Sequence, residues 1–243
     1  MTDRTTLEKL CAGRNKDKDV TLINNMVGRK IVMSVTGLAM IFFVIIHLLG
    51  NTSMFRGPDS INAYADILHS FGPFIWMLRI FMFSALCLHA FFGIQLALEN
   101  RAAKPQKYAV KISRSASFAG QNMIWTGLII AAYLVYHLLH FTVQVIAPEF
   151  SASQNHDAMG RPDVFSMVVH SFRNIVVSGI YVVAMAAVGL HLSHGMQSMV
   201  QTLGLNNEKT LPVMAKIGIA AALILFLGYA AIPAGIISGM VGR

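Results

Sequence analysis

Five long apolar stretches dominate the sequence, and polar segments separate them. The stretches cover about residues 31–50, 74–98, 122–146, 174–200 and 213–238. Each reaches the roughly 20 residues that an α-helix needs to cross a bilayer. None has the period-two alternation of barrel strands, and a backbone in lipid must satisfy its own hydrogen bonds. The pattern predicts an all-α integral membrane bundle of five transmembrane helices within residues 29–243.

The polar segments predict how these helices are connected. Residues 1–28 form a polar arm that lacks the apolar core and cleavage site of a signal peptide. The segment 51–72 has apolar positions at helical spacing after Gly57-Pro58, which predicts a helix lying along the membrane surface. Segments 99–121 and 147–169 are expected to be polar loops on opposite sides of the membrane.

Composition and charge narrow the class of protein. The 243 residues are 55% apolar and only 12% charged, unlike an ordinary soluble domain. The net charge of +8 does not form a basic stripe interleaved with aromatic residues, so it does not indicate nucleic-acid binding. The two cysteines, Cys11 and Cys87, are not expected to form a disulfide. The arm 1–28 and the loop 99–121 are predicted to be cytoplasmic, because basic residues concentrate in and next to them. These residues are Arg14, Lys16, Lys18, Arg29, Lys30, Arg101, Lys104, Lys107, Lys111 and Arg114.

An internal repeat divides the chain into two related halves. In each half a Thr-Gly pair is followed by a histidine eleven residues after the threonine, and a second histidine precedes a glycine by four residues. The matching residues of the two halves are Thr36-Gly37 and Thr126-Gly127, His47 and His137, His89 and His191, and Gly93 and Gly195.

The four repeated histidines lie inside apolar stretches, where an ionisable side chain is costly and indicates function. Equivalent helices of the two halves run in the same direction. His47 and His137 (the outer pair) are therefore expected in the outer half of the membrane, and His89 and His191 (the inner pair) in the inner half. Two imidazoles can fill the two axial positions of a haem iron, and the two irons would differ in depth by roughly 12 Å.

The residues around these histidines leave alternatives open. Gly93 and Gly195 would make room for a flat macrocycle or for close helix packing. Two pairs of histidines have the spacing His-x-x-His, namely His137 with His140 and His191 with His194. This spacing could suggest one metal site shared by all four side chains. The two motifs are expected at different depths, however, so His140 and His194 are interpreted as neighbours of the ligands, as residues near a quinone, or as packing residues. A haem-free transporter is disfavoured because the halves show no matched Gly/Pro-interrupted spans and no carboxylate inside them.

Several motifs in this order resemble the single-subunit, di-haem cytochrome b membrane anchors of succinate dehydrogenases and fumarate reductases. The resemblance covers most of residues 28–205. It depends on Gly28-Arg29-Lys30, Ser34-x-Thr36-Gly37, His47-Leu-Leu, the Gly57-Pro58 to Asn62-Ala-Tyr64-Ala loop, His89-Ala-Phe, Thr126-Gly127, His137-Leu-Leu-His-Phe141, Ser171-Phe-Arg173 and Gly189-Leu-His191-Leu-Ser-His-Gly195.

The resemblance implies two haem b groups, one held by His47 with His137 and the other by His89 with His191. It implies a multi-pass subunit of a prokaryotic cytoplasmic membrane that exchanges electrons with a quinone, menaquinone being the expected one. A flavoprotein with FAD and an iron–sulfur subunit would dock on the cytoplasmic face and carry out the dicarboxylate chemistry. The anchors of hydrogenases and formate dehydrogenases are the alternative family.

Further residue roles follow from the resemblance alone. It implies haem propionate contacts for Arg29, Lys30 and Ser34 at the inner side and for Arg173 at the outer side, with anchoring at the membrane interface as the alternative. Asn62, Tyr64 and His69 are candidates for the quinone site, although the loop that carries them can be purely structural. Some fumarate reductases of this kind have a glutamate two residues before the last ligand, proposed as a proton route. Here that position is Gly189, so a proton route through it is in doubt.

Overall fold

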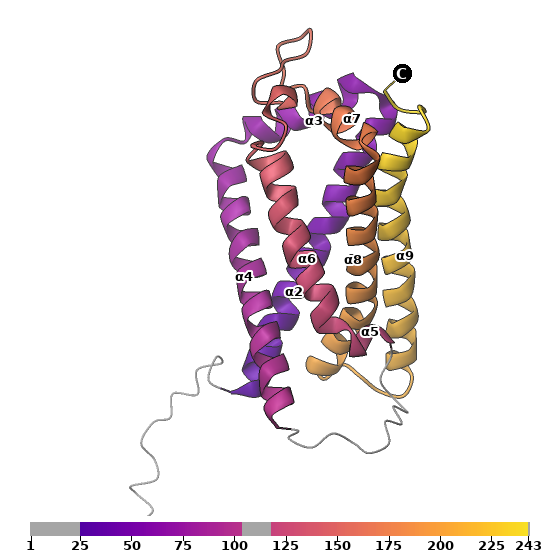
Figure 1. Cartoon of the computed structure of the whole chain (residues 1–243). Helices are drawn as coiled ribbons and strands as arrows, with labels where there is room; N and C mark the ends of the chain where they lie inside the picture. The colour runs from indigo at the N-terminus through magenta and orange to yellow at the C-terminus, as the bar shows by residue number, and fades with distance from the viewer. Residues whose placement is uncertain (1–24, 104–117, 243) are drawn as a thin grey trace, which may run out of the picture.

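The computed structural model describes residues 25–103 and 118–242 (Figure 1). Within these two segments the regular secondary structure is helical, and the extended pairing is a single bridge between His156 and Pro162. The arm before residue 25 and the basic residues between 104 and 117 lie outside the described residues. The predicted cytoplasmic position of the N-terminus therefore stays a prediction.

Five helices are long and apolar enough to cross a membrane, as the sequence predicts. Figure 1 shows them side by side in one bundle. They are α2 (Met26–Asn51), continued by the 3-10 turn η1 (Thr52–Arg56); α4 (Pro73–Ala102); α6 (Met123–His137), continued by the π turn η2 (Leu138–Thr142); α8 (Ile175–Thr202); and α9 (Thr210–Ile237).

Local capping explains where several helices begin. The side chain of Asn25 accepts a hydrogen bond from the Gly28 amide at 2.6 Å, so α2 begins three residues before the boundary expected at residue 29. Asn174 caps α8 in the same way. The helices α3 (Pro58–Ser70) and α4 each begin with a proline, which has no amide hydrogen to leave unpaired in the first turn.

Two shorter helices lie across one end of the bundle (Figure 1). The first, α3, is the predicted surface helix. The second, α7 (Val164–Arg173), lies where the sequence analysis expected only a loop. Its signal was present but short: Asp163 caps a ten-residue segment that buries Met167, Val168 and Phe172. Two other short elements are η3 (Pro148–Phe150) and α5 (Phe118–Gln121), which lies at the opposite end.

The third membrane helix ends earlier than the expected residue 146. The π turn η2 loosens the helix after His137, and Gln144 and Ala147 then take positive φ angles of 60° and 52°. A right-handed helix needs negative φ angles, so the helix cannot continue through these two residues. The irregular turn brings His140, which is 4% exposed, into the bundle.

The helices of each half of the repeat pack against each other. Helix α2 packs along α4 in the first half, and α6 packs along α8 in the second. Helix α9 covers α8, where a Cβ at Gly218 would lie 3.1 Å from both the Met196 Cβ and the Ser193 carbonyl oxygen. Small residues allow such close approach of membrane helices. One buried cluster joins α2, α8 and α9 through Leu48, Leu192 and Leu225.

Candidate functional site: two histidine pairs

The four repeated histidines meet in the two predicted pairs. The ring centroids of His47 on α2 and His137 at the end of α6 are 6.1 Å apart, with an angle of 84° between the ring planes. Those of His89 on α4 and His191 on α8 are 6.2 Å apart, with an angle of 62°. Each pair therefore takes one imidazole from each half of the chain.

These separations fit a single metal ion between the two rings. Metal–imidazole bonds of about 2.0 Å, with about 1.1 Å from nitrogen to ring centre, place the centres of two opposed rings roughly 6.2 Å apart. Among the described residues, no group of three or more His, Cys, Asp or Glu side chains is arranged to hold a metal. A metal between the rings would therefore need its remaining ligands from a group such as a porphyrin, and the shared four-histidine site is not formed.

The inner pair is held through the Nδ1 atoms of its rings. His89 Nδ1 lies 2.9 Å from the Met33 carbonyl oxygen and 3.5 Å from Thr36 Oγ1. His191 Nδ1 lies 3.1 Å from Thr126 Oγ1. Backbone and hydroxyl oxygens can accept the Nδ1 proton, which leaves Nε2 as the nitrogen with a free lone pair. Both rings are therefore prepared to bind a metal through Nε2.

The outer pair has a different environment. His137 Nδ1 lies 3.4 Å from the Tyr181 hydroxyl, which lies 3.2 Å from His140 Nδ1. His140 Nε2 in turn contacts the Ser171 hydroxyl at 3.0 Å. Ring stacking holds His47 instead, because Phe43 lies parallel to it at 5.4 Å.

Two glycines follow His89 and His191 by one helical turn and have only one light contact each. A Cβ built at Gly93 would meet only the Met33 sulfur, at 3.8 Å, and one at Gly195 would meet only the Met123 Cε, also at 3.8 Å. The two methionines are equivalent in the repeat. A flat group could therefore approach both helices at the same place in each half.

The end of the bundle near α5 contains polar groups that have no hydrogen-bond partner. Arg29 forms an ion pair with Glu99, but its Nε atom is buried without a partner among the described residues. The same is true of His194 Nδ1. Ser34 is also buried there, at 8% exposure. Such groups are costly to bury unpaired, so they fit a site for a polar or charged part of a ligand.

Comparison with known proteins supports the expected family. Residues 25–121 match the family model described as the succinate dehydrogenase/fumarate reductase transmembrane subunit. The first part of the chain is therefore similar to the transmembrane subunits of this family. It is also 27% identical, over 186 residues, to the succinate dehydrogenase cytochrome b558 subunit of Bacillus subtilis (strain 168), an alignment that covers 76% of this chain and 82% of the relative. No solved structure gave a significant match. The assignment favours the expected membrane anchor over the hydrogenase or formate dehydrogenase anchor and over the transporter.

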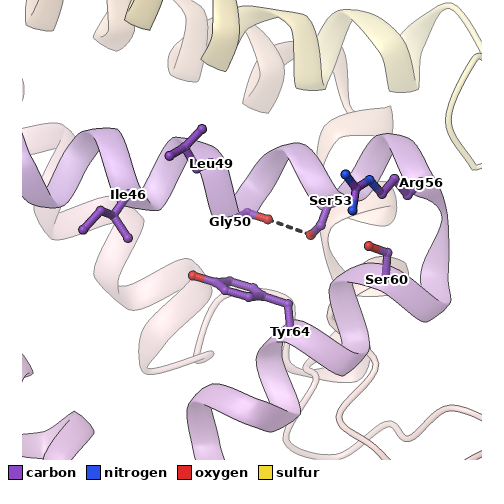
Figure 2. Close-up of a pocket in the computed structure, with 7 residues that line it drawn as sticks. All are labelled: Ile46, Leu49, Gly50, Ser53, Arg56, Ser60 and Tyr64. Atoms are coloured by element: carbon purple, nitrogen blue, oxygen red, sulfur yellow. Dashed lines mark hydrogen bonds between the residues drawn. The ribbon is translucent and has the colours of Figure 1, made fainter.

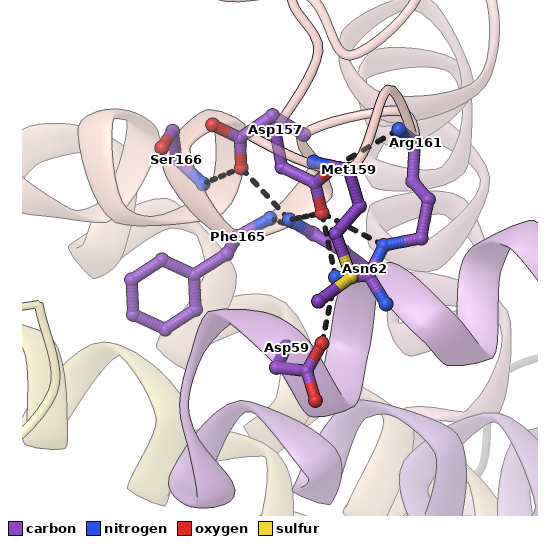
Figure 3. Close-up of polar contacts among 8 residues, drawn as sticks. Asp59, Asn62, Asp157, Met159, Arg161, Phe165 and Ser166 are labelled. Atoms are coloured by element: carbon purple, nitrogen blue, oxygen red, sulfur yellow. Dashed lines mark hydrogen bonds and ion pairs between the residues drawn. The ribbon is translucent and has the colours of Figure 1, made fainter.

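Asn62 is fully buried in a polar clasp at the α3 end of the bundle (Figure 3). Its amide nitrogen donates to the Asp157 and Asp163 carboxylates at 3.3 and 3.2 Å, and its oxygen accepts from the Phe165 amide at 2.9 Å. Arg161 hydrogen-bonds the Asp157 carboxylate and lowers its pKa to about 2. The hydrogen bonds of Asn62 thus tie α3 to the segment before α7.

Tyr64 borders two cavities. One, of about 350 Å³, lies between α2, α3 and α4, and His47, Phe42 and Phe81 are among the residues that line it. The other, of about 380 Å³, has a polar side formed by Ser53, Arg56 and Ser60 (Figure 2). His69, the third quinone candidate, is exposed near the end of α3.

The remaining propionate candidates are Lys30 and Arg173. Lys30 is partly exposed in the first turns of α2, next to Arg29. Arg173 lies at the end of α7, and its guanidinium donates to the Gly242 carbonyl at 2.6 Å. Its contact with the C-terminal segment gives it a structural role in the subunit.

The residues that contact the rings of the four repeated histidines were not predicted from the sequence. Thr36, Thr126, Tyr181 and Phe43 were assigned no role. For the threonines the signal was the repeat itself, because Thr-Gly recurs at the same offset in both halves. No comparable signal marked Tyr181, which reaches His137 only through the packing of α8 against α6.

Proposed function

We propose that this transmembrane subunit binds two haem b groups and transfers electrons between an iron–sulfur partner and a quinone. The observation that carries the proposal is the pair of opposed imidazoles at 6.1 and 6.2 Å, one pair from each set of equivalent helices. The name of the B. subtilis relative, a cytochrome b558 subunit, supports the choice of haem b. One-electron transfer is the chemistry that haem b supplies when bound.

His47 and His137 would hold one haem, and His89 and His191 the other. Arg29 and His194 are suited to a propionate of the inner haem, because each has a buried nitrogen without a partner in the described part of the chain. Lys30 and Ser34 lie on the same stretch of α2 and can contribute to that contact. His140 would act indirectly, since it holds the Tyr181 hydroxyl that faces His137.

The partners follow from the family. A flavoprotein with FAD and an iron–sulfur subunit would dock at the α5 end of the bundle, which the basic residues of the sequence assign to the cytoplasm of a prokaryotic cell. The 29–243 region would form the membrane domain, with residues 1–28 as a cytoplasmic arm. Succinate or fumarate chemistry would take place in those partners.

The quinone would bind at the opposite end, beside the outer pair. The apolar cavity that reaches His47 has the Tyr64 ring at its edge, which suits the apolar body and polar carbonyls of a quinone such as menaquinone. His69 on the same helix remains a candidate at the surface. Asn62 would support the site only by fixing α3, because its amide is already engaged by three partners.

Gly189 bears on how electron transfer is coupled to the membrane. It packs against α9, where a Cβ would lie 3.6 Å from the Ala222 carbonyl oxygen. No titratable group at this position can return a proton, so electron transfer across the bundle would be coupled to the membrane potential. A potential-sensitive dye in vesicles containing the whole complex tests this, and turnover without any change of potential would refute it.

Haem content of the complex tests the main proposal. Reduced-minus-oxidised spectra should show two b-type components. We expect His47→Ala and His137→Ala to remove one component, and His89→Ala and His191→Ala to remove the other. His156→Ala, in the loop before α7, should retain both. A colourless complex, or two members of one pair that remove different components, would contradict the proposal.

A further inference from the structure

The repeated Thr-Gly motif contacts the inner histidine of its own half. In the first half, Thr36-Gly37 on α2 faces His89 on α4; in the second, Thr126-Gly127 on α6 faces His191 on α8. The threonine hydroxyl is directed at Nδ1, and a Cβ built at the glycine would face Cε1 of the same ring. In both halves the motif therefore faces the same side of the imidazole, with the hydroxyl at Nδ1 and space for no more than a small residue near Cε1.

We infer that Thr36-Gly37 and Thr126-Gly127 are positioning residues that set the orientation and electron donation of the inner ligands. This inference rests on the proposed haem binding. A hydrogen bond that accepts the Nδ1 proton makes the imidazole a stronger electron donor to a metal at Nε2. Stronger donation stabilises the ferric state, so loss of the hydrogen bond raises the midpoint potential of that haem.

The two halves use the threonine to different extents. His191 Nδ1 lies 3.1 Å from Thr126 Oγ1. His89 Nδ1 lies 3.5 Å from Thr36 Oγ1 but 2.9 Å from the Met33 carbonyl oxygen, which remains when the threonine is replaced. Loss of the Thr126 hydroxyl should therefore affect His191 more than loss of the Thr36 hydroxyl affects His89.

The space beside the ring is smaller at the glycine of the first half than at the glycine of the second half. A Cβ at Gly37 would lie 3.1 Å from His89 Cε1, so the ring has to move by a few tenths of an ångström. A Cβ at Gly127 would lie 3.5 Å from His191 Cε1, which is ordinary contact. Replacement of Gly37 by a larger residue should therefore move its histidine ring more than replacement of Gly127.

Redox titration and ferric low-spin EPR of the whole complex test the inference. We expect Thr126→Val to raise the potential of the inner haem alone, to change its EPR signal, and to speed release of that haem by about tenfold or more. Thr36→Val should do the same to a smaller degree. Gly37→Ala should change the inner-haem EPR signal more than Gly127→Ala, because the signal reports ring orientation.

Two controls separate the hydroxyl from general packing. Thr126→Ser keeps the hydroxyl and should restore the wild-type potential and signal. Thr142→Val changes an exposed threonine just beyond the other end of the same helix and should leave both haems unchanged.

The outcomes are distinct. A wild-type complex without two haems refutes the proposed function itself. Two haems in the wild type with an unshifted inner haem in Thr126→Val refute this inference alone. Equal shifts of both haems in Thr126→Val, or a Thr126→Ser variant that behaves like Thr126→Val, also refute it, because the hydroxyl would then not act on His191.

Discussion

Replacing Asn62 with alanine should open the clasp that ties α3 to residues 157–166. Asn62 is fully buried and makes three hydrogen bonds, two to carboxylates and one from a backbone amide. The substitution leaves the Phe165 amide and two carboxylates without this partner. At about 1 kcal/mol for each bond, the loss is about 3 kcal/mol. The equilibrium for local opening should then shift roughly 100-fold, since about 1.4 kcal/mol corresponds to a factor of ten.

Hydrogen exchange followed by mass spectrometry measures this shift directly. Amides of the segment 157–166 should exchange up to about 100-fold faster in Asn62→Ala, because exchange from local opening follows its free energy. Asn207→Ala removes an exposed side chain that accepts hydrogen bonds from two backbone amides at the opposite end of the bundle, and should leave this segment unchanged.

The same variant separates the clasp from the alternative role of Asn62 in binding quinone. Exchange of 157–166 within about threefold of wild type would refute the structural reasoning. If quinone reduction were impaired in that case, Asn62 would instead contact the substrate. Faster exchange together with slower quinone reduction would agree with a clasp that fixes α3 beside the cavity.

Three further predictions concern other parts of the structure. The pKa of Asp157 is lowered to about 2 from 3.8, so its stabilising effect is complete above about pH 4 and is lost as the pH falls toward 2; hydrogen exchange of the clasp should accelerate in this window. Asp157→Asn should reduce the change and leave the part due to Asp163, whose pKa is also lowered because its desolvation is outweighed by its hydrogen bonds. Gly189→Glu should cost at least about 1–3 kcal/mol by overpacking against α9, measured as a lower unfolding temperature, whereas Gly179→Glu, which faces open space, should cost less. Tyr181→Phe should raise the potential of the outer haem only in a redox titration, because His137 loses its Nδ1 partner; an unchanged outer potential would contradict this role.

The membrane helices could be predicted from the sequence because their signal is local. A long apolar stretch has few alternatives in a bilayer, and the five stretches agree with the five helices to within about five residues at each end. The end of α6 was misplaced because a π turn and two positive φ angles do not alter the apolar pattern. The helix α7 was missed because it is short and is stabilised by packing rather than by length.

The histidine pairs could also be predicted, because the repeat fixes direction and depth together. The contacts to their Nδ1 atoms could not, since they depend on the rotation of each helix about its axis. Asn62 shows the same limit: its amide suggested a ligand contact, and only the structure shows that Asp157, Asp163 and Phe165 use all of it.

The pairing of equivalent residues has a consequence for the origin of the chain. His47 faces its counterpart His137, and His89 faces its counterpart His191, as residues do across the two-fold axis of a homodimer. An ancestor of half this length could have completed both centres by associating with a second copy of itself. Gene duplication and fusion would then have joined the copies, after which each half was free to diverge, as the unequal surroundings of the four rings now show.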